Sequence, residues 1–176
     1  MTILPIRQLG DPVLRERTQD VESFDDVLMR LYQDMVETMY DAPGVGLAAP
    51  QVGLALRFFV FDANDGSGAH AVANPVLSGL EGSQEEDEGC LSIPGLWYPS
   101  TRALHARVDG LDVDGNPISF EGEGLAARIF QHETDHLAGT LFIDRLPDRD
   151  RREALASLRD QDLTPRPGRS VRPPPD

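Results

Sequence analysis

The sequence lacks lysine altogether and contains a single cysteine, Cys90, in 176 residues. An intramolecular disulfide is therefore excluded, and Cys90 is left as a small buried residue, a nucleophile or a metal ligand. Long hydrophobic runs are also missing, since the densest, residues 58–61, has four residues, far fewer than the roughly 20 needed to cross a bilayer. The N-terminus has no basic start followed by an apolar stretch, so we expect no signal peptide, no membrane partner and a cytoplasmic location.

Positive charge is scarce as well. All 16 basic residues are arginine, against 30 acidic residues, and the formal net charge is −14. Because sequence-independent binding of nucleic acids depends on neutralising phosphates, this balance argues against free nucleic acid as a partner. We interpret the acidic run at residues 85–87 as a solvated loop. The chain length and a hydrophobic content of 40% indicate one globular domain.

The spacing of apolar residues predicts an α+β fold, with mostly antiparallel strands around a central helix. An N-terminal amphipathic helix is expected over residues 24–41, with Ser23 as its N-cap. The central helix is expected over residues 123–137, with its apolar residues, Leu125 among them, facing inward. Gly139 would end it.

Strand-like segments lie between these helices. They are residues 56–62, 71–77, 103–109 and 117–121, the last two joined by a hairpin turn at Asp114-Gly115. Pro75 suits an edge strand or a bulge, because proline cannot donate to a sheet ladder.

The strongest chemical signal is His132-Glu133-Thr134-Asp135-His136, an H-E-x-x-H pattern in the predicted central helix. Four residues turn a helix by about 400°, so the two imidazoles lie roughly 40° apart and about 6 Å along the axis. One metal ion can therefore accept a nitrogen from each ring. Glu133, rotated by about 100° from His132, is placed to act as a general base without being a ligand. The alternative is an ordinary helix that carries these residues by chance.

A catalytic metal usually has three protein ligands. No histidine follows His136, and the next glutamate, Glu153, lies in a charged segment beyond a loop. Cys90 can supply a thiolate, which is a good ligand for iron or zinc. A buried structural cysteine is the alternative, but beside a two-histidine helix without a third ligand we favour the ligand. His70 and His105 are expected to be exposed structural residues.

The segment 44–51, GVGLAAPQ, is the third candidate. It loosely matches a dinucleotide fingerprint, but that motif needs a strand before it and a helix after it, whereas here a helix precedes it and Pro50 follows. We interpret the segment instead as an extended wall that a ligand's backbone can approach. Gln51 could then direct an amide N–H at a developing oxyanion.

GVGLAAPQ, EGCLS and QHETDH, in this order, resemble the three motifs of the peptide deformylase family, and GDPVLR near the N-terminus is also similar. The resemblance covers residues 3–146. It implies antiparallel sheets around the metal-bearing helix, and a metallohydrolase acting on a linear amide. The implied reaction removes the N-formyl group from the N-terminal formyl-methionine of newly synthesised proteins and releases formate.

The resemblance also implies roles for individual residues. The implied metal ligands are Cys90, His132 and His136. Glu133 would be the general acid/base, Gln51 and the backbone N–H of Leu91 would bind the oxyanion, and the backbone of Gly46 would bind the substrate. Fe²⁺ is implied as the working metal, with Zn²⁺, Ni²⁺ or Co²⁺ able to substitute. The spacing of the ligands does not itself show that preference.

We expect residues 1–147 to form the catalytic domain, 148–162 a C-terminal helix, and 163–176 a disordered tail rich in proline and arginine. Related bacterial enzymes dock near the ribosomal exit tunnel through such a helix, so the ribosome is a candidate partner beside formylated nascent chains. Pro43 and Trp97 stand where many bacterial relatives carry Glu and Arg. This leaves the peptide preference beyond formyl-methionine open.

Two rival functions remain. A zinc endopeptidase would cut internal peptide bonds and would not need Cys90. A non-catalytic deformylase-like binder is disfavoured by the presence of Gln51 and Glu133. A supporting hypothesis pairs Arg102 with Asp135 behind the site, where the pair would hold the central helix in place.

Overall fold

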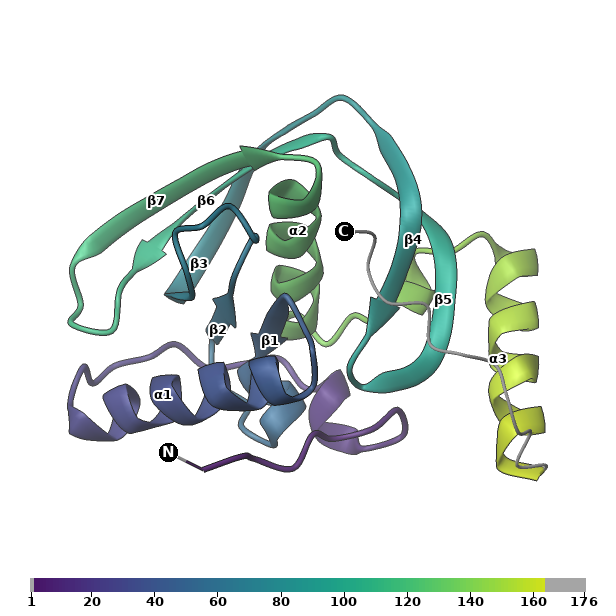
Figure 1. The fold of residues 1–176 in the computed structure, drawn as a ribbon, viewed down its shortest axis with the longest axis horizontal. Helices are drawn as coiled ribbons and strands as arrows, with labels where there is room; N and C mark the ends of the chain where they lie inside the picture. The colour runs from purple at the N-terminus through teal and green to yellow at the C-terminus, as the bar shows by residue number, and fades with distance from the viewer. Residues whose placement is uncertain (1, 164–176) are drawn as a thin grey trace.

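The computed structural model describes residues 2–163, and of residues 160–163 only the backbone. The described chain has two antiparallel sheets (Figure 1). The larger has the order β1 (Gly46–Ala48), β2 (Phe58–Phe61), β3 (His70–Glu81), β6 (His105–Leu111) and β7 (Pro117–Glu123), and the smaller pairs β4 (Gln84–Cys90) with β5 (Ile93–Arg102). The helices are α1 (Asp26–Asp41), α2 (Leu125–Leu137) and α3 (Asp148–Leu163), with short 3₁₀ helices η1 (Pro12–Arg15), η2 (Ala49–Val52) and η3 (Phe142–Asp144).

This architecture confirms the predicted α+β fold, with its antiparallel sheets, central helix and terminal helices. The tail predicted for residues 163–176 lies, beyond Leu163, outside the described residues. In the described part of the chain, no helix is both long and apolar enough to cross a bilayer.

Helices α1 and α2 cover opposite faces of the larger sheet. Successive side chains of a strand point to opposite faces, and strand β2 follows this rule: Phe58 and Val60 pack in the cluster under α1, whereas Phe59 and Phe61 pack in the cluster under α2. A strand buried on both faces has no polar side to expose. This is why β2 reads as an uninterrupted apolar run, and why helix α2 rests on a rigid support.

The ends of the helices differ in detail from the sequence prediction. Helix α1 begins at Asp26, and the N-cap is Asp25, whose carboxylate accepts hydrogen bonds from the backbone N–H groups of Val27 and Leu28. The prediction of Ser23 was wrong, because both residues are N-cap types and only the path of the chain selects one of them. Leu125, predicted to face inward, is 43% exposed at the first position of α2.

Strand β3 is a central strand between β2 and β6, not an edge strand. Pro75 lies where its register against β6 shifts, between Ala73 and Val76. The bulge was therefore predicted correctly and the edge position was not. A bulge lets proline stand inside a sheet because the extra residue there needs no ladder hydrogen bond.

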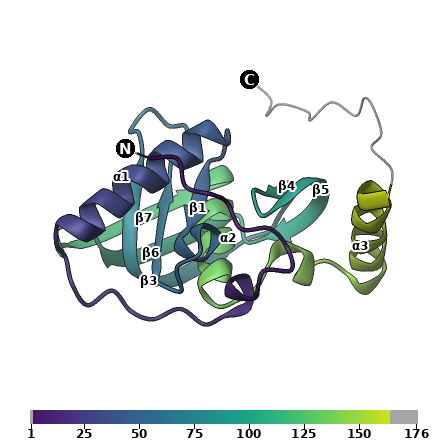
Figure 2. The same cartoon turned by 90° about the horizontal axis from the view of Figure 1, so that it is seen from below.

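The β4–β5 hairpin lies between helices α2 and α3 (Figures 1 and 2). Its first strand contains Glu85, Glu86 and Asp87, which are exposed but paired with Thr101, Ser100 and Pro99. The interpretation of this acidic run as a loop was wrong, although its exposure was correctly predicted. Beneath the hairpin lies a third apolar cluster, which includes Cys90 and Ile93 from the hairpin, Phe142 from η3 and Ala154 from α3.

Candidate metal centre

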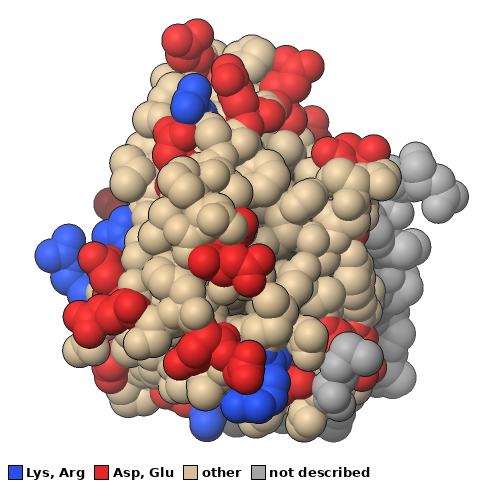
Figure 3. Space-filling model, turned by 90° about the vertical axis from the view of Figure 1, so that its left-hand side faces the viewer, with Lys and Arg blue, Asp and Glu red and all other residues tan. Residues whose placement is uncertain are grey.

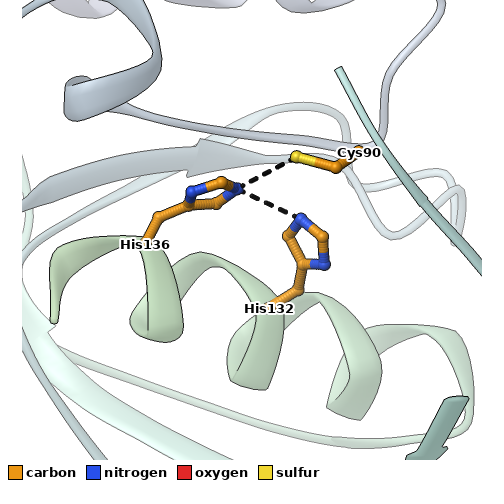
Figure 4. Close-up of side chains that lie close together, drawn as sticks. All are labelled: Cys90, His132 and His136. Carbon is orange, nitrogen blue, oxygen red and sulfur yellow. Dashed lines mark hydrogen bonds between the residues drawn. The ribbon is translucent and has the colours of Figure 1, made fainter. Parts of the chain in front are cut away.

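Cys90, His132 and His136 meet where the end of β4 approaches helix α2 (Figure 4). The Sγ atom of Cys90 lies 3.3 Å from Nε2 of His136, and that nitrogen lies 3.2 Å from Nε2 of His132. The three ligand atoms all lie within 4.8 Å of one another. The predicted convergence of one thiol and two imidazoles is therefore present in the fold.

The chemistry of this donor set fits a transition metal such as zinc or iron. Metal–sulfur bonds of about 2.3 Å and metal–nitrogen bonds of about 2.0–2.1 Å allow one ion to contact atoms at these separations. The Nδ1 atom of His132 is engaged by a carboxylate at 2.6 Å, so Nε2 is the nitrogen that faces the other two ligands. Three protein ligands leave a position open, as in catalytic sites.

Glu133 lies beside these ligands and is almost completely buried, with 3% of its surface exposed. Its Oε2 atom has no hydrogen-bond partner among the described residues. Burial raises the pKa of this carboxyl to about 7, and the neighbouring His132 opposes the rise. A carboxyl whose pKa lies near neutrality can both accept and donate a proton at physiological pH.

The glycine-rich segment, residues 44–51, lines the site next to Glu133. A Cβ atom built on Gly46 would lie 2.8 Å from Cδ of Glu133 and closer still to Oε1, so only glycine fits here. Leu91 approaches the same segment, because a Cβ on Gly44 would lie 2.8 Å from its Cδ1. Residues 46–48 form strand β1, which agrees with the extended wall predicted from the sequence.

Gln51 is buried in η2 with its amide directed at the metal ligands. Its Oε1 accepts a hydrogen bond from the backbone N–H of Ala48 at 2.8 Å. This contact fixes which end of the amide faces the site. The Nε2 atom then lies 3.6 Å from Sγ of Cys90 and 3.3 Å from Oγ of Ser92. The group therefore presents N–H donors next to the thiol, as its predicted role requires.

Glu88 is the residue of the site that the sequence analysis did not single out. Its Oε1 accepts from Nδ1 of His132 at 2.6 Å, and its two oxygens accept from Nη2 and Nε of Arg102 at 2.6 and 3.0 Å. Burial would raise the pKa of Glu88, but the hydrogen bonds from His132 and Arg102 outweigh it and hold that pKa well below its ordinary value. The signal in the sequence was its place as the first residue of the EGCLS motif, two residues before Cys90.

The predicted pair of Arg102 and Asp135 is confirmed. Nη1 of Arg102 lies 2.7 Å from Oδ2 of Asp135, and both side chains are buried. Arg145 adds a second guanidinium on the same carboxylate, with its Nε 3.1 Å from Oδ2 and its Nη2 2.5 Å from Oδ1. Arg102 thus bridges the carboxylates of β4 and α2, and ties the hairpin to the helix that carries both histidines.

The two remaining histidines lie away from this centre, as predicted. His105 is exposed on β6 and pairs with Glu123 at 3.6 Å. His70 is half-buried instead of exposed, because its ring packs against Phe61 and Phe120 and its Nε2 lies 2.9 Å from Oγ of Ser67.

Comparison with known proteins places the chain among enzymes of one kind. The family model described as polypeptide deformylase matches residues 3–152. A peptide deformylase of Acidothermus cellulolyticus is 51% identical over 172 residues, covering 98% of this chain and 93% of that protein. The crystal structure of a peptide deformylase from Legionella pneumophila superposes with a TM-score of 0.86 at 42% identity, covering 92% of this chain and 96% of that one. The enzyme from Thermus thermophilus gives a TM-score of 0.85 at 47% identity, with the same coverage.

Proposed function

The chain belongs to the peptide deformylase family, and it removes the formyl group from the N-terminal methionine of newly made proteins. We propose that Cys90, His132 and His136 hold the metal for this hydrolysis. We propose further that Glu133 accepts and donates the protons. The observation that carries the proposal is the meeting of the three ligand atoms within 4.8 Å, with the buried carboxyl of Glu133 on the residue after His132.

A bound metal ion supplies Lewis acidity, which acidifies a water molecule and polarises the formyl carbonyl. Glu133 accepts a proton from the attacking water. It later donates a proton to the departing amine nitrogen, and formate is released. The unpartnered Oε2 and the pKa near 7 support both halves of this role.

The donors around the carbonyl stabilise the oxyanion that develops during attack. Gln51 offers its Nε2–H and Leu91 its backbone N–H, and one such donor is typically worth roughly 10²–10³ in rate. A role of the Gly46 backbone in substrate binding is supported by its place in β1, an edge strand of the larger sheet, because an edge strand can pair with an extended peptide.

We propose Fe²⁺ as the working ion, with Zn²⁺, Ni²⁺ or Co²⁺ as substitutes. One thiolate and two imidazoles suit each of these metals, so the assignment rests on the family. We also propose that the enzyme acts in the cytoplasm on nascent chains, and that helix α3 is the segment through which it could approach the ribosome. Acidic side chains predominate over arginines on the face drawn in Figure 3, which disfavours free nucleic acid as a partner.

Anaerobic purification followed by metal analysis and a formate-release assay tests the proposal. We expect one metal ion per chain, release of formate from formyl-Met peptides, and no cleavage of unformylated peptides. Cleavage at internal bonds, retained when Cys90 is replaced by alanine, would instead identify a zinc endopeptidase. Metal binding without any turnover would identify the non-catalytic alternative.

A further inference from the structure

Arg128 is a buried arginine on helix α2 for which the proposed reaction supplies no role. It lies one helical turn before His132, and only 7% of its surface is exposed. Its Nη1 donates to Oε2 of Glu88 at 2.6 Å, and its Nη2 donates to the backbone carbonyl of Ser100 at 3.0 Å. Burying a guanidinium is costly unless it is paired and hydrogen-bonded. These two contacts therefore explain how the buried charge of Arg128 is tolerated, but they do not explain why an arginine is present at this position.

Charge neutralisation does not explain Arg128. Of the three buried carboxyl groups beside the metal centre, Glu133 takes part in none of the ion pairs of the described residues, and the other two, Glu88 and Asp135, already have two arginines besides Arg128. Arg102 contacts both carboxylates and Arg145 contacts the second. Arg128 is therefore a third positive charge on a cluster whose two negative charges are matched. An apolar side chain on this face of α2 would avoid the desolvation cost that Arg128 incurs.

The geometry shows what the additional cation does to Glu88. That carboxylate accepts four hydrogen bonds, two on each oxygen. Arg128 and Nε of Arg102 hold Oε2, while Nη2 of Arg102 and the ring of His132 hold Oε1. Arg128 thus donates to Oε2, the oxygen of Glu88 that does not contact His132. Without Arg128, only Nε of Arg102 would donate to Oε2 and hold that oxygen away from the ring.

We propose that Arg128 is a positioning residue for the metal centre: it fixes the carboxylate of Glu88 so that Oε1 accepts from Nδ1 of His132 and Nε2 of that ring points at the metal. This inference rests on the proposed function, because it requires His132 to be a ligand. Groups that orient ligating histidines commonly affect metal affinity by about 10–100-fold. Arg128 acts one step further away, through Glu88, so we expect about a tenfold effect.

A purely structural role is the alternative. Arg128 also donates to the carbonyl of Ser100, and it could serve only to clamp β5 to α2. The variant Arg128→Gln separates the two roles, because a glutamine keeps an N–H donor but loses the charge on Glu88. The variant Arg128→Lys keeps the charge and is the conservative rescue. Arg107→Gln is the matched control, since Arg107 pairs with Asp109 in an exposed ion pair on β6.

The measurement uses the full-length protein loaded with Co²⁺, followed by the rate at which an excess of chelator removes the ion. Arg128→Gln should release Co²⁺ about ten times faster than the parent protein, Arg128→Lys should recover most of the slow release, and Arg107→Gln should not change it. The thiolate-to-Co²⁺ absorption should persist in every variant, because Cys90 is not disturbed. Circular dichroism and thermal melting of the metal-free forms verify that each variant is folded.

A double-mutant cycle with Glu88→Gln then tests the route of the effect. If Arg128 acts through Glu88, the substitution Arg128→Gln should have little or no further effect on Co²⁺ release once Glu88 is replaced. Two results would overturn the inference: Arg128→Gln accelerates Co²⁺ release equally in the parent protein and in Glu88→Gln, or Arg128→Gln alone leaves the release unchanged. Either result would leave the hydrogen bond to the carbonyl of Ser100 as the role of Arg128. Failure of the parent protein to bind one Co²⁺ per chain would instead contradict the proposed function.

Discussion

The five-stranded sheet and the β4–β5 hairpin differ in what holds each of them against helix α2. The sheet presents Phe59, Phe61 and Val72 to the apolar side of the helix. The hairpin lies on the other side of the helix (Figure 2) and meets it through Glu88 and Arg102, whose partners include His132 and Asp135. The contact between the sheet and α2 is apolar burial, which has no preferred direction. The contact between the hairpin and α2 consists of charged hydrogen bonds, which require accurate distances and angles.

This difference explains where the chemistry lies. A two-stranded hairpin is at best marginally stable alone, so its position depends on its ion pairs with α2 and on the apolar cluster that it shares with η3 and α3. The contact of Glu88 with α2 orients His132, and the end of the same strand brings Cys90 to His136. The sheet holds the helix still, and the hairpin completes the metal centre. Substitutions in the two regions should therefore have different consequences, with catalysis and metal binding affected at the hairpin side and stability affected at the sheet side.

The largest expected effect is at Glu133, on the junction of the two regions. Glu133→Ala should lower kcat by about 10²–10⁴-fold, the usual contribution of a general acid/base, while the protein keeps its metal and its fold. Formate release at saturating substrate, together with metal analysis, measures both. Glu121→Ala, at an exposed carboxylate on β7, is the control and should be active. Full activity in metal-loaded Glu133→Ala would refute the assigned role.

The next largest effect is at Phe58, in the sheet. This fully buried ring packs in the cluster under α1, and Phe58→Ala should lower the free energy of unfolding by about 3–5 kcal/mol. The folded fraction should keep its metal and most of its kcat, because Phe58 lies on the face of the sheet opposite to helix α2 and its two histidines. Denaturant unfolding gives the energy, with exposed Val27→Ala on α1 as the control, expected within about 0.5 kcal/mol. A large loss of kcat in folded protein would show that the two regions are not separable.

A smaller effect is expected at Gly46, where the sheet itself touches the site. The new methyl group in Gly46→Ala would collide with Glu133, and displacing a catalytic group by about 1 Å can cost about 10²-fold in rate. Gly44→Ala is a matched comparison, because its methyl group would meet only the flexible end of Leu91 and should cost less. Steady-state kinetics decide between them. Equal losses in the two variants would argue against the close fit to Glu133 as the cause.

The smallest effect is at Tyr98, where the hairpin meets α3. Its hydroxyl donates to Oε2 of Glu153 at 2.9 Å on the protein surface. Tyr98→Phe should lower the melting temperature only slightly, because exposed hydrogen bonds contribute little to stability, and should leave kcat and metal content unchanged. Thermal melting and formate release check both. A loss of metal in Tyr98→Phe would mean that α3 supports the centre more strongly than this contact indicates.

The two regions also differ in how much of their structure the sequence predicts. Helix α1, the β6–β7 hairpin and the H-E-x-x-H helix were predicted because apolar periodicity and turn residues are local signals. Strands β4 and β5 were missed, since three consecutive acids resemble a loop and their strand pairing depends on a partner further along the chain. The bulge at Pro75 was predicted, but the central position of β3 was not, because nothing local fixes the order of strands in a sheet.

The sequence by itself determined the residue types of the metal centre and the helical spacing that puts His132 and His136 on one face, since a helix has a fixed geometry. Only the tertiary structure decided that Cys90 reaches those rings and that Glu88 directs one of them. It also decided that Arg128 stands behind Glu88. These contacts join strands and a helix that are distant in sequence, and buried charges can be paired only once burial has brought them together.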